Sequence, residues 1–350
     1  MKIYLTLLAL LSANSAFAAD FNPETIDDKI EIGYGLSIGD VDGDMKPDIL
    51  IADKREIRWY SNPTWESHVI AKNLTLRDNV CIATTAGSGG LQIAVGAQWN
   101  PGENRDREKS GAVFYLSRPE DPTGAWTPVK LPHDPTTHRM HWLDAETLAV
   151  LPLHGIGGNS VRLGLYKKPS NPSDPTAWKV SYVDTGLTKA HNFDLIGNSA
   201  LVAGAEGSYA YPSGERTADP KGFGEIRRHG NILAGISPMH GNEVRVQRDG
   251  KWTTLDDSLN QGHALAIGDL LGTGMPQVVA AWRNPDKTGK VGIRIYSQPQ
   301  EGGQWTTQQI DENTMACEDL KIADLDSDGD LDVIAAGRAS KNLIIYWNTP

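Results

Sequence analysis

The stretch that decides the fold is Ala323-Asp324-Leu325-Asp326-Ser327-Asp328-Gly329-Asp330-Leu331-Asp332-Val333-Ile334-Ala335-Ala336, near the end of the 350-residue chain. It places an acidic loop between two short apolar runs, the pattern of two β-strands joined by a turn. Residues 39–52 repeat this pattern with similar acids, and residues 268–281 keep its spacing but lose most of the acids. The chain therefore contains an internal repeat of strand-loop-strand units.

Four weaker copies fill the middle of the chain, at residues 80–96, 137–155, 190–207 and 224–241. A third apolar strand follows most copies, and a fourth, often opened by tryptophan, follows that strand. Seven copies within residues 19–350 give about 47 residues each, the size of a four-stranded propeller blade. The sequence predicts an all-β fold: one seven-bladed β-propeller of four-stranded antiparallel blades over residues 19–350, without a second domain.

The two ends of the chain bear on closure and location. The chain stops after a third strand, so we expect the segment around Glu24 to Ile32 to complete the last blade and leave no open edge. Residues 1–18 combine Lys2, an apolar run and Ala16-Phe17-Ala18, which is the layout of a secretory signal peptide. No later apolar run approaches the length of a membrane span. We expect a periplasmic or secreted monomer that does not enter the membrane.

Charge and cysteine content exclude other classes. The formal net charge is -11, and it becomes -12 when Lys2 is removed with the signal peptide. Such an acidic chain does not predict nucleic-acid binding, which needs clustered cations. Cys81 and Cys317 fall on blades that are not neighbours, so we expect no disulfide between them.

The acidic repeats resemble a known family. Asp-x-Asp-Gly-Asp at residues 40–44 and Asp-x-Asp-x-Asp-Gly-Asp-x-Asp at residues 324–332 are similar to FG-GAP/VCBS repeats, which form seven-bladed propellers in integrin α chains and secreted bacterial proteins. The stretch at residues 262–269 and two Pro-x-His-Gly sequences resemble more narrowly the propellers of aldos-2-ulose dehydratase-type proteins. That resemblance implies elimination of water from a keto-sugar, and some polysaccharide lyases also use seven-bladed propellers.

Carboxylates at positions 1, 3, 5 and 9 of a loop can surround one hard cation, with a carbonyl oxygen at position 7. The sequence therefore predicts one or two structural calcium ions, in the first and last blades. Blade six, with Leu271, Thr273 and Gln277 at the matching positions, is predicted to bind none. The residues expected at the two sites are Asp40, Asp42, Asp44 and Asp48 in blade one, and Asp324, Asp326, Asp328, Asp330 and Asp332 in blade seven.

The histidines are the second feature of the sequence that predicts a functional site. When the blades are aligned on the loops, six of the nine histidines fall where the innermost strand begins or the second strand ends, at the end opposite the acidic loops. The predicted catalytic set is His138, His141, His154, His191, His240, His263 and Tyr34. The residues predicted to bind substrate at the same rim are Lys54, Trp99, Arg227, Arg283, Glu318 and Arg338.

This rim predicts an anionic carbohydrate as the ligand, because an acidic protein gathers cations there, and the charged loop at residues 100–111 could extend a cleft over it. A neutral histidine can take a proton from a carbon beside a carboxylate, arginine can hold the carboxylate, and tyrosine can protonate the leaving oxygen. We therefore expect a lyase or dehydratase that acts by β-elimination on an acidic or keto-sugar. Two alternatives stay open: a non-catalytic scaffold that binds glycan or protein, and a hydrolase with zinc or another divalent ion on the histidines.

Overall fold

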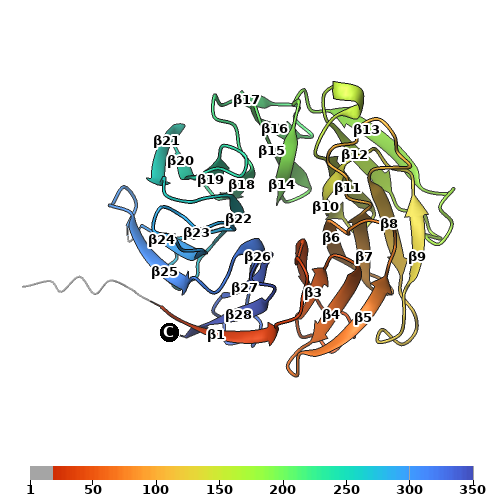
Figure 1. Cartoon of the computed structure of the whole chain (residues 1–350), viewed down its shortest axis with the longest axis horizontal. Helices are drawn as coiled ribbons and strands as arrows, with labels where there is room; N and C mark the ends of the chain where they lie inside the picture. The colour runs from red at the N-terminus through yellow and green to blue at the C-terminus, as the bar shows by residue number, and fades with distance from the viewer. Residues whose placement is uncertain (1–18, 299, 350) are drawn as a thin grey trace, which may run out of the picture.

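The computed structural model of the protein describes residues 19–298 and 300–349, so the expected signal peptide at residues 1–18 lies outside the described residues. Seven four-stranded antiparallel sheets form a ring (Figure 1), which confirms the predicted seven-bladed propeller. The innermost strands contact one another around the ring axis. They are β2 (Gly35–Gly39), β6 (Cys81–Gly87), β10 (Thr137–Asp144), β14 (Ala190–Ile196), β18 (Glu225–His229), β22 (Gly262–Gly268) and β26 (Cys317–Ala323).

The other strands follow outward in each blade. The second strands are β3 (Asp48–Ala52), β7 (Gly90–Ala97), β11 (Thr147–Pro152), β15 (Ser199–Gly204), β19 (Ile232–Ser237), β23 (Gln277–Trp282) and β27 (Asp332–Gly337). The third strands are β4 (Glu56–Ser61), β8 (Ala112–Ser117), β12 (Arg162–Lys167), β16 (Gly207–Tyr211), β20 (Glu243–Arg248), β24 (Gly292–Ser297) and β28 (Leu343–Thr349). The outer strands are β5 (Glu66–Lys72), β9 (Thr127–Leu131), β13 (Lys179–Asp184), β17 (Arg216–Ala218), β21 (Lys251–Asp256), β25 (Thr306–Glu312) and β1 (Asp20–Asp27).

Strand β1 closes the ring. It pairs antiparallel with β28, from Asp20 opposite Thr349 to Asp27 opposite Leu343, and becomes the outer strand of blade seven. The closing strand predicted around Glu24 to Ile32 therefore exists, but it begins and ends a few residues earlier. Sheet pairing between the two ends of the chain means that no blade edge is left open at the junction.

Among the described residues, the core consists of seven hydrophobic clusters, which lie mainly between neighbouring blades. Blades one and two share Leu50, Trp59 and Ile93, whereas blades seven and one share Ile49, Ile334 and others. Apolar side chains project from both faces of the strands, so both faces of each sheet pack against a neighbour. The ring is stabilised by every interface together rather than by a core inside any one blade.

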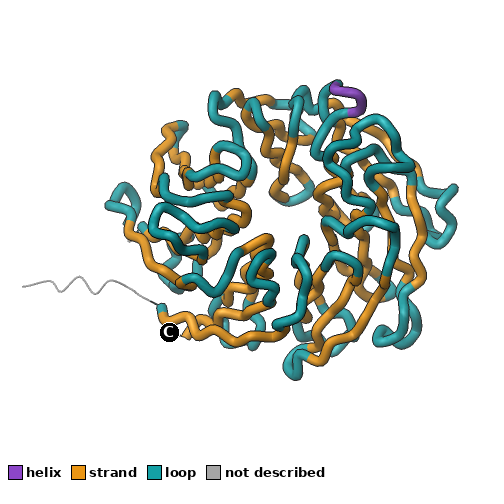
Figure 2. The backbone as a smooth tube through the Cα atoms, in the orientation of Figure 1, coloured by secondary structure: helices purple, strands orange, loops and turns teal. Residues whose placement is uncertain are grey.

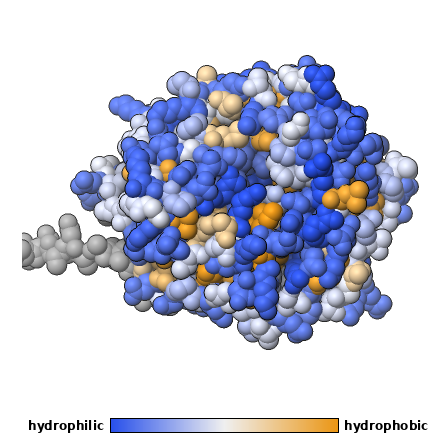
Figure 3. All heavy atoms as spheres, in the orientation of Figure 1, coloured by the Kyte–Doolittle hydropathy of each residue, from blue (hydrophilic) through white to orange (hydrophobic). Residues whose placement is uncertain are grey.

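Outside the strands, the described residues form loops and one short helical segment, the single turn η1 (Ile156–Gly158) (Figure 2). No helix in this part of the chain has the length and apolar character that a membrane span requires. The face seen in Figure 3 is mostly hydrophilic, with small hydrophobic patches near its centre.

The innermost strands all run in the same direction along the axis, from the end with the predicted histidines to the end with the acidic loops.

Candidate functional site

Four innermost strands begin with a β-bulge. In β10, Thr137 pairs with Pro152 and Arg139 pairs with Leu151, so His138 is the extra residue. A bulge bends its strand and redirects the extra side chain. The same irregularity recurs in β14, β22 and β26, and the four extra residues are His138, His191, His263 and Glu318. The local backbone thus presents a predicted site residue in each of these blades.

Three imidazoles form a compact group, here called the histidine triad: His191, His240 and His263. Their ligand nitrogens all lie within 4.8 Å of one another, and Nε2 of His191 is 2.8 Å from Nε2 of His240. His240 comes from the turn after β19, where its φ of 53° is uncommon for a residue other than glycine. Blades four, five and six therefore each contribute one ring.

Hydrogen bonds at Nδ1 determine which nitrogen of two triad rings is free. Nδ1 of His191 lies 3.1 Å from the carbonyl oxygen of Gly224, and Nδ1 of His263 lies 2.5 Å from the carbonyl oxygen of Glu318. A carbonyl oxygen only accepts, so each Nδ1 carries the hydrogen and each neutral ring has its lone pair on Nε2. Histidines that bind metals are commonly oriented in this way.

His138 has the opposite arrangement. Its ring stacks on Trp99 with centroids 4.8 Å apart and packs edge-on against His191 at 4.7 Å. Arg139 donates from Nη1 to Nδ1 of His138 at 3.1 Å. Because guanidinium has no acceptor, the neutral His138 ring carries its hydrogen on Nε2. His138 is thus a hydrogen-bond donor beside the triad rather than a fourth ligand.

Two buried carboxylates pair with the predicted arginines. Glu225 accepts from Nη2 of Arg227 at 3.0 Å and lies 3.2 Å from Nδ1 of His191. Glu318 accepts from Arg283 at 3.0 Å and from Arg338 at 3.1 Å. The sequence analysis included Glu318 but missed Glu225. Blade five begins without a bulge, so its acid falls one position later than the alignment with the histidines predicts.

Burial keeps these imidazoles neutral at pH 7. Burial, followed by the neighbouring His191 and Arg283, lowers the pKa of His240 to about 2. Burial and the charge of Arg283 hold the pKa of His263 well below its ordinary value, and burial with Arg139 does the same for the pKa of His138. For His191, burial lowers the pKa more than the Glu225 carboxylate raises it. Neutral imidazole is the form that binds metals.

The remaining predicted residues lie around this group. His141 is deeper along β10, where its ring packs edge-on against Phe193 at 4.7 Å. His154 is half-buried at the end of blade three and bridges to Lys189. Tyr34 lies under the guanidinium of Arg338 at 5.3 Å, whereas Lys54 pairs with Glu31 on the surface. In the described part of the chain, none of these four shares a hydrogen bond, an ion pair or an aromatic ring contact with the triad.

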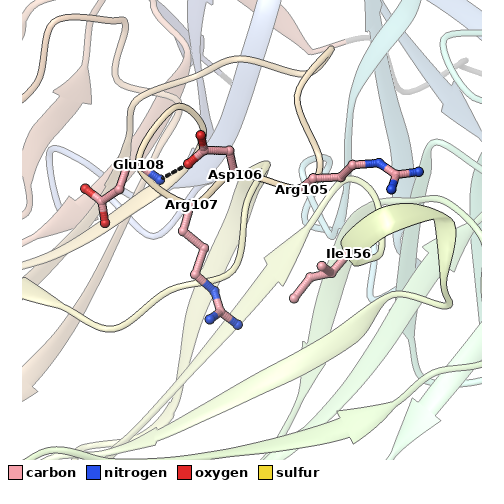
Figure 4. A pocket seen from close by; sticks show the side chains of 5 residues that line it. All are labelled: Arg105, Asp106, Arg107, Glu108 and Ile156. Carbon is pink, nitrogen blue, oxygen red and sulfur yellow. Dashed lines mark hydrogen bonds between the residues drawn. The ribbon is translucent and has the colours of Figure 1, made fainter.

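Two hollows open at the histidine end. One, of about 460 Å³, is lined by Arg283 and Arg338 together with Ile32, Gln261, Asn284 and Ala339. The other, of about 520 Å³, lies between the loop after β7 and η1 (Figure 4). In that view Arg105 and Arg107 extend in different directions, and Ile156 faces them from η1. The charged loop at residues 100–111 therefore does border a hollow.

The acidic loops of blades one and seven share one conformation at the opposite end. Asp40, Asp42 and Asp48 form one group of carboxylates within 4.8 Å, and Asp324, Asp326 and Asp328 form another. Asp332 accepts from the backbone N–H groups of Leu325 and Asn348, as Asp48 does from Val41 and Asn62. Burial, together with the charges of neighbouring loop aspartates, raises the pKa of Asp48 and of Asp332 to about 6.

One oxygen in blade seven distinguishes its loop. Oδ1 of Asp324 is inaccessible to solvent and makes no hydrogen bond to any described residue. An unpaired buried carboxylate oxygen is costly unless a cation or a donor meets it. Met45 in blade one has a φ of 69° and Gly329 at the matching position has a φ of 100°, so the loop does require the left-handed region and blade one accepts it with methionine.

Comparisons with known proteins support the fold. No family model matches the chain, and no curated protein matches it. A chain in the crystal structure of a mitotic checkpoint complex is 10% identical with a TM-score of 0.64, over 99% of this chain and 98% of that chain. BBS1N, crystallised in complex with ARL6DN, is 15% identical with a TM-score of 0.59, over 95% and 96%.

A bacterial protein gives a third match. The extracellular domain of a candidate one-component system from B. thetaiotaomicron is 12% identical with a TM-score of 0.54, and the match covers 93% of this chain but 39% of that chain. At these identities the similarity shows the propeller fold alone.

Proposed function

We propose that the protein is an exported, metal-dependent lyase that acts on an acidic sugar at the histidine end of the propeller, and that it belongs with the FG-GAP/VCBS-type propellers. The observation that carries the proposal is the histidine triad, in which three neutral rings from three blades bring their ligand nitrogens within 4.8 Å of one another. Structural packing does not require this convergence, because each ring belongs to a separate blade.

The donor set fits a divalent transition metal. Imidazole nitrogen suits zinc, copper, iron and nickel, whereas carboxylate oxygen suits calcium and magnesium. Three protein ligands with an open position are typical of catalytic zinc. His191, His240 and His263 would hold zinc. The carbonyl oxygens of Gly224 and Glu318 fix two of these rings in the ligand tautomer. When bound, zinc would supply a Lewis acid that polarises an oxygen of the substrate.

The side chains around the triad supply the proton transfers of a β-elimination. In this reaction a base removes the proton on the carbon beside the carboxylate, a carbon–carbon double bond forms, and the bond to the leaving oxygen breaks. His138 can donate its Nε2 hydrogen to that oxygen, because Arg139 occupies Nδ1. His154 is our candidate for the base, since it is half-buried and neutral: burial, followed by the charge of Lys189, lowers its pKa.

The acidic loops support a second, structural metal role. Three carboxylates of each loop lie within 4.8 Å, and blade seven adds the unpartnered Oδ1 of Asp324. Calcium would bind these oxygens and hold the turn between the innermost and second strands. The blade-six loop reaches a similar conformation without these acids: Asp269 accepts from the N–H groups of Thr273 and Gly274. Calcium therefore stabilises the turn rather than creating it.

An ultraviolet absorbance screen for the conjugated double bond that β-elimination forms tests the proposal. Purified protein loaded with zinc is incubated with oligomers of uronic acids and with keto-sugars, and reducing ends are measured in parallel. A lyase produces unsaturated sugars that absorb, and chelation of zinc removes the activity. New reducing ends without absorbance indicate a hydrolase instead. Glycan binding without any product would leave the scaffold alternative in its place.

A further inference from the structure

The predicted arginines of the histidine end are already paired with acids of the protein. Arg227 is bonded to Glu225, and Arg283 and Arg338 are both bonded to Glu318. Two lysines are paired as well: Lys54 with Glu31 at this end, and Lys321 with Asp319 on the innermost strand β26. A carboxylate ligand would therefore have to displace an acid of the protein from each of these cations.

Arg139 is different. Its side chain is 8% exposed. Nη1 donates to the carbonyl oxygens of Val80 and His138 and to Nδ1 of His138. Within residues 19–298 and 300–349, no carboxylate lies within 4.0 Å of this guanidinium, and Nε and Nη2 make no hydrogen bond. A buried cation without an anionic partner is costly, and such groups are normally paired.

Arg139 lies on the innermost strand β10, and its guanidinium contacts the ring of His138, which packs against His191 of the triad. It belongs to blade three, yet its charge acts on groups of blades four to seven. Burial is the main cause of the low pKa of His263, and Arg283 and Arg139 are among the charges that lower it further. For Asp319, burial raises the pKa, but Lys321 and then Arg139 lower it below its ordinary value. These effects agree with the contact of Arg139 with His138 beside the triad.

We infer that Arg139 binds the carboxylate of the substrate through its free Nε and Nη2 edge, next to the histidine triad, and so selects a uronic acid over a neutral sugar. The inference deepens the proposed function and rests on it for the class of sugar. Guanidinium and carboxylate match as a two-pronged pair, which fixes the orientation of the sugar as well as its charge. The same side chain keeps the hydrogen of His138 on Nε2, so one arginine would place the carboxylate and prepare the donor.

Calorimetric titration of two probes tests this inference. Glucuronate and its uncharged methyl ester are titrated into the zinc-loaded wild type, Arg139→Gln, Arg139→Lys and the control Arg228→Gln, whose arginine is exposed on β18. Wild type and Arg228→Gln should prefer the acid. Arg139→Gln should bind glucuronate roughly 10- to 100-fold more weakly, as expected for a hydrogen bond between charged groups, with the ester unaffected. Arg139→Lys should bind glucuronate with intermediate affinity, because lysine keeps the positive charge but lacks the planar, two-pronged guanidinium group.

Several results would overturn the inference. The first is equal binding of glucuronate by Arg139→Gln and wild type. The second is a preference for the acid that survives the substitution. The third is a wild type that does not bind glucuronate. Thermal melts show whether each variant is folded, and Arg139→Lys decides the question if Arg139→Gln is not. The zinc content, measured separately, distinguishes the two proposals: anion binding that depends on Arg139 without zinc leaves the inference in place and removes the metal centre.

Discussion

The two ends of the innermost strands use the same blade in opposite ways. At the acidic end, blades one and seven repeat an acidic loop, and each group of three carboxylates comes from a single loop. At the histidine end, no blade holds a site alone: three blades give one ring each. The comparison teaches that repetition places a group of acids within one loop, whereas divergence between repeats brings side chains of different blades into one cluster. Changes at the acidic end should therefore affect stability, and changes at the histidine end should affect chemistry.

The largest effect should come from removing strand β1, because the structure at both ends of the propeller depends on a closed ring. Deleting residues 21–31 removes most of β1, which pairs with β28 along its whole length. The open edge and the lost interface should destabilise the entire ring, so that both activity and calcium binding disappear together. A thermal melt with two probes measures this. A truncated protein that melts at the parent temperature would show that closure by β1 is unnecessary.

Single histidine changes should separate the two ends. His240→Ala removes one ring of the triad and His138→Ala removes the donor beside it. His138→Ala should lower turnover by about 10²–10⁴-fold, the usual contribution of an acid–base group. His240→Ala should also lower turnover, because a metal ligand is lost, and neither change should alter the melt much. His229→Ala, on the exposed end of β18, is the matched control. Full activity in both site variants would mean that these rings only pack.

Removing the charge of Glu225 should have a smaller effect on the same site. Its carboxylate lies 3.2 Å from Nδ1 of His191 and accepts from Asn192 at 2.6 Å. Glu225→Gln keeps the shape but removes the charge, and such changes around a metal ligand usually weaken metal affinity about 10- to 100-fold. Competition with a zinc indicator measures the zinc affinity of the variant and of the wild type. Unchanged affinity would mean that the Gly224 carbonyl oxygen alone is enough to orient the ring.

The smallest effect is expected at the acidic end. Asp328→Ala should remove one calcium ion and lower the melting temperature, because calcium that binds only the native state at roughly 100-fold above its Kd contributes about 2.7 kcal/mol. Activity below the melt should stay the same. Asp269→Ala in blade six, where no ion is expected, should leave the calcium content unchanged. Loss of turnover in Asp328→Ala would contradict the separation of the two ends.

Much of the architecture was predictable because the repeat is visible in the sequence. The acidic loops at residues 40–48 and 324–332 gave the blade length, and the blade length placed His138, His191 and His263 at equivalent positions. Strand β1 was also predicted, although its bounds were shifted, since outer strands have few apolar residues to mark them. In blade two, Gly87 pairs with Gly90 across a two-residue turn, so a short glycine-rich hairpin stands where blades one and seven carry acidic loops.

The site was less predictable for two physical reasons. Bulges are not visible in a hydrophobic pattern, so the pattern could align His138 with His191 but could not show that each is the extra residue of its strand. Ion pairs between side chains are also not visible in the sequence. Arg283 and Arg338 were predicted to bind substrate, and both form ion pairs with Glu318. Arg139 follows the aligned histidine by one position and was overlooked, because its importance depends on the partners it lacks.

The central claim is that the histidine triad is a metal site. The most direct measurement is elemental analysis of zinc in the protein dialysed against limiting zinc, for wild type and for His263→Ala, with the melt recorded for both. The proposal predicts about one zinc ion per wild-type chain, less than roughly one-tenth of that in the variant, and similar melting of the metal-free forms. Equal zinc in the two proteins, or none in the wild type, would contradict it.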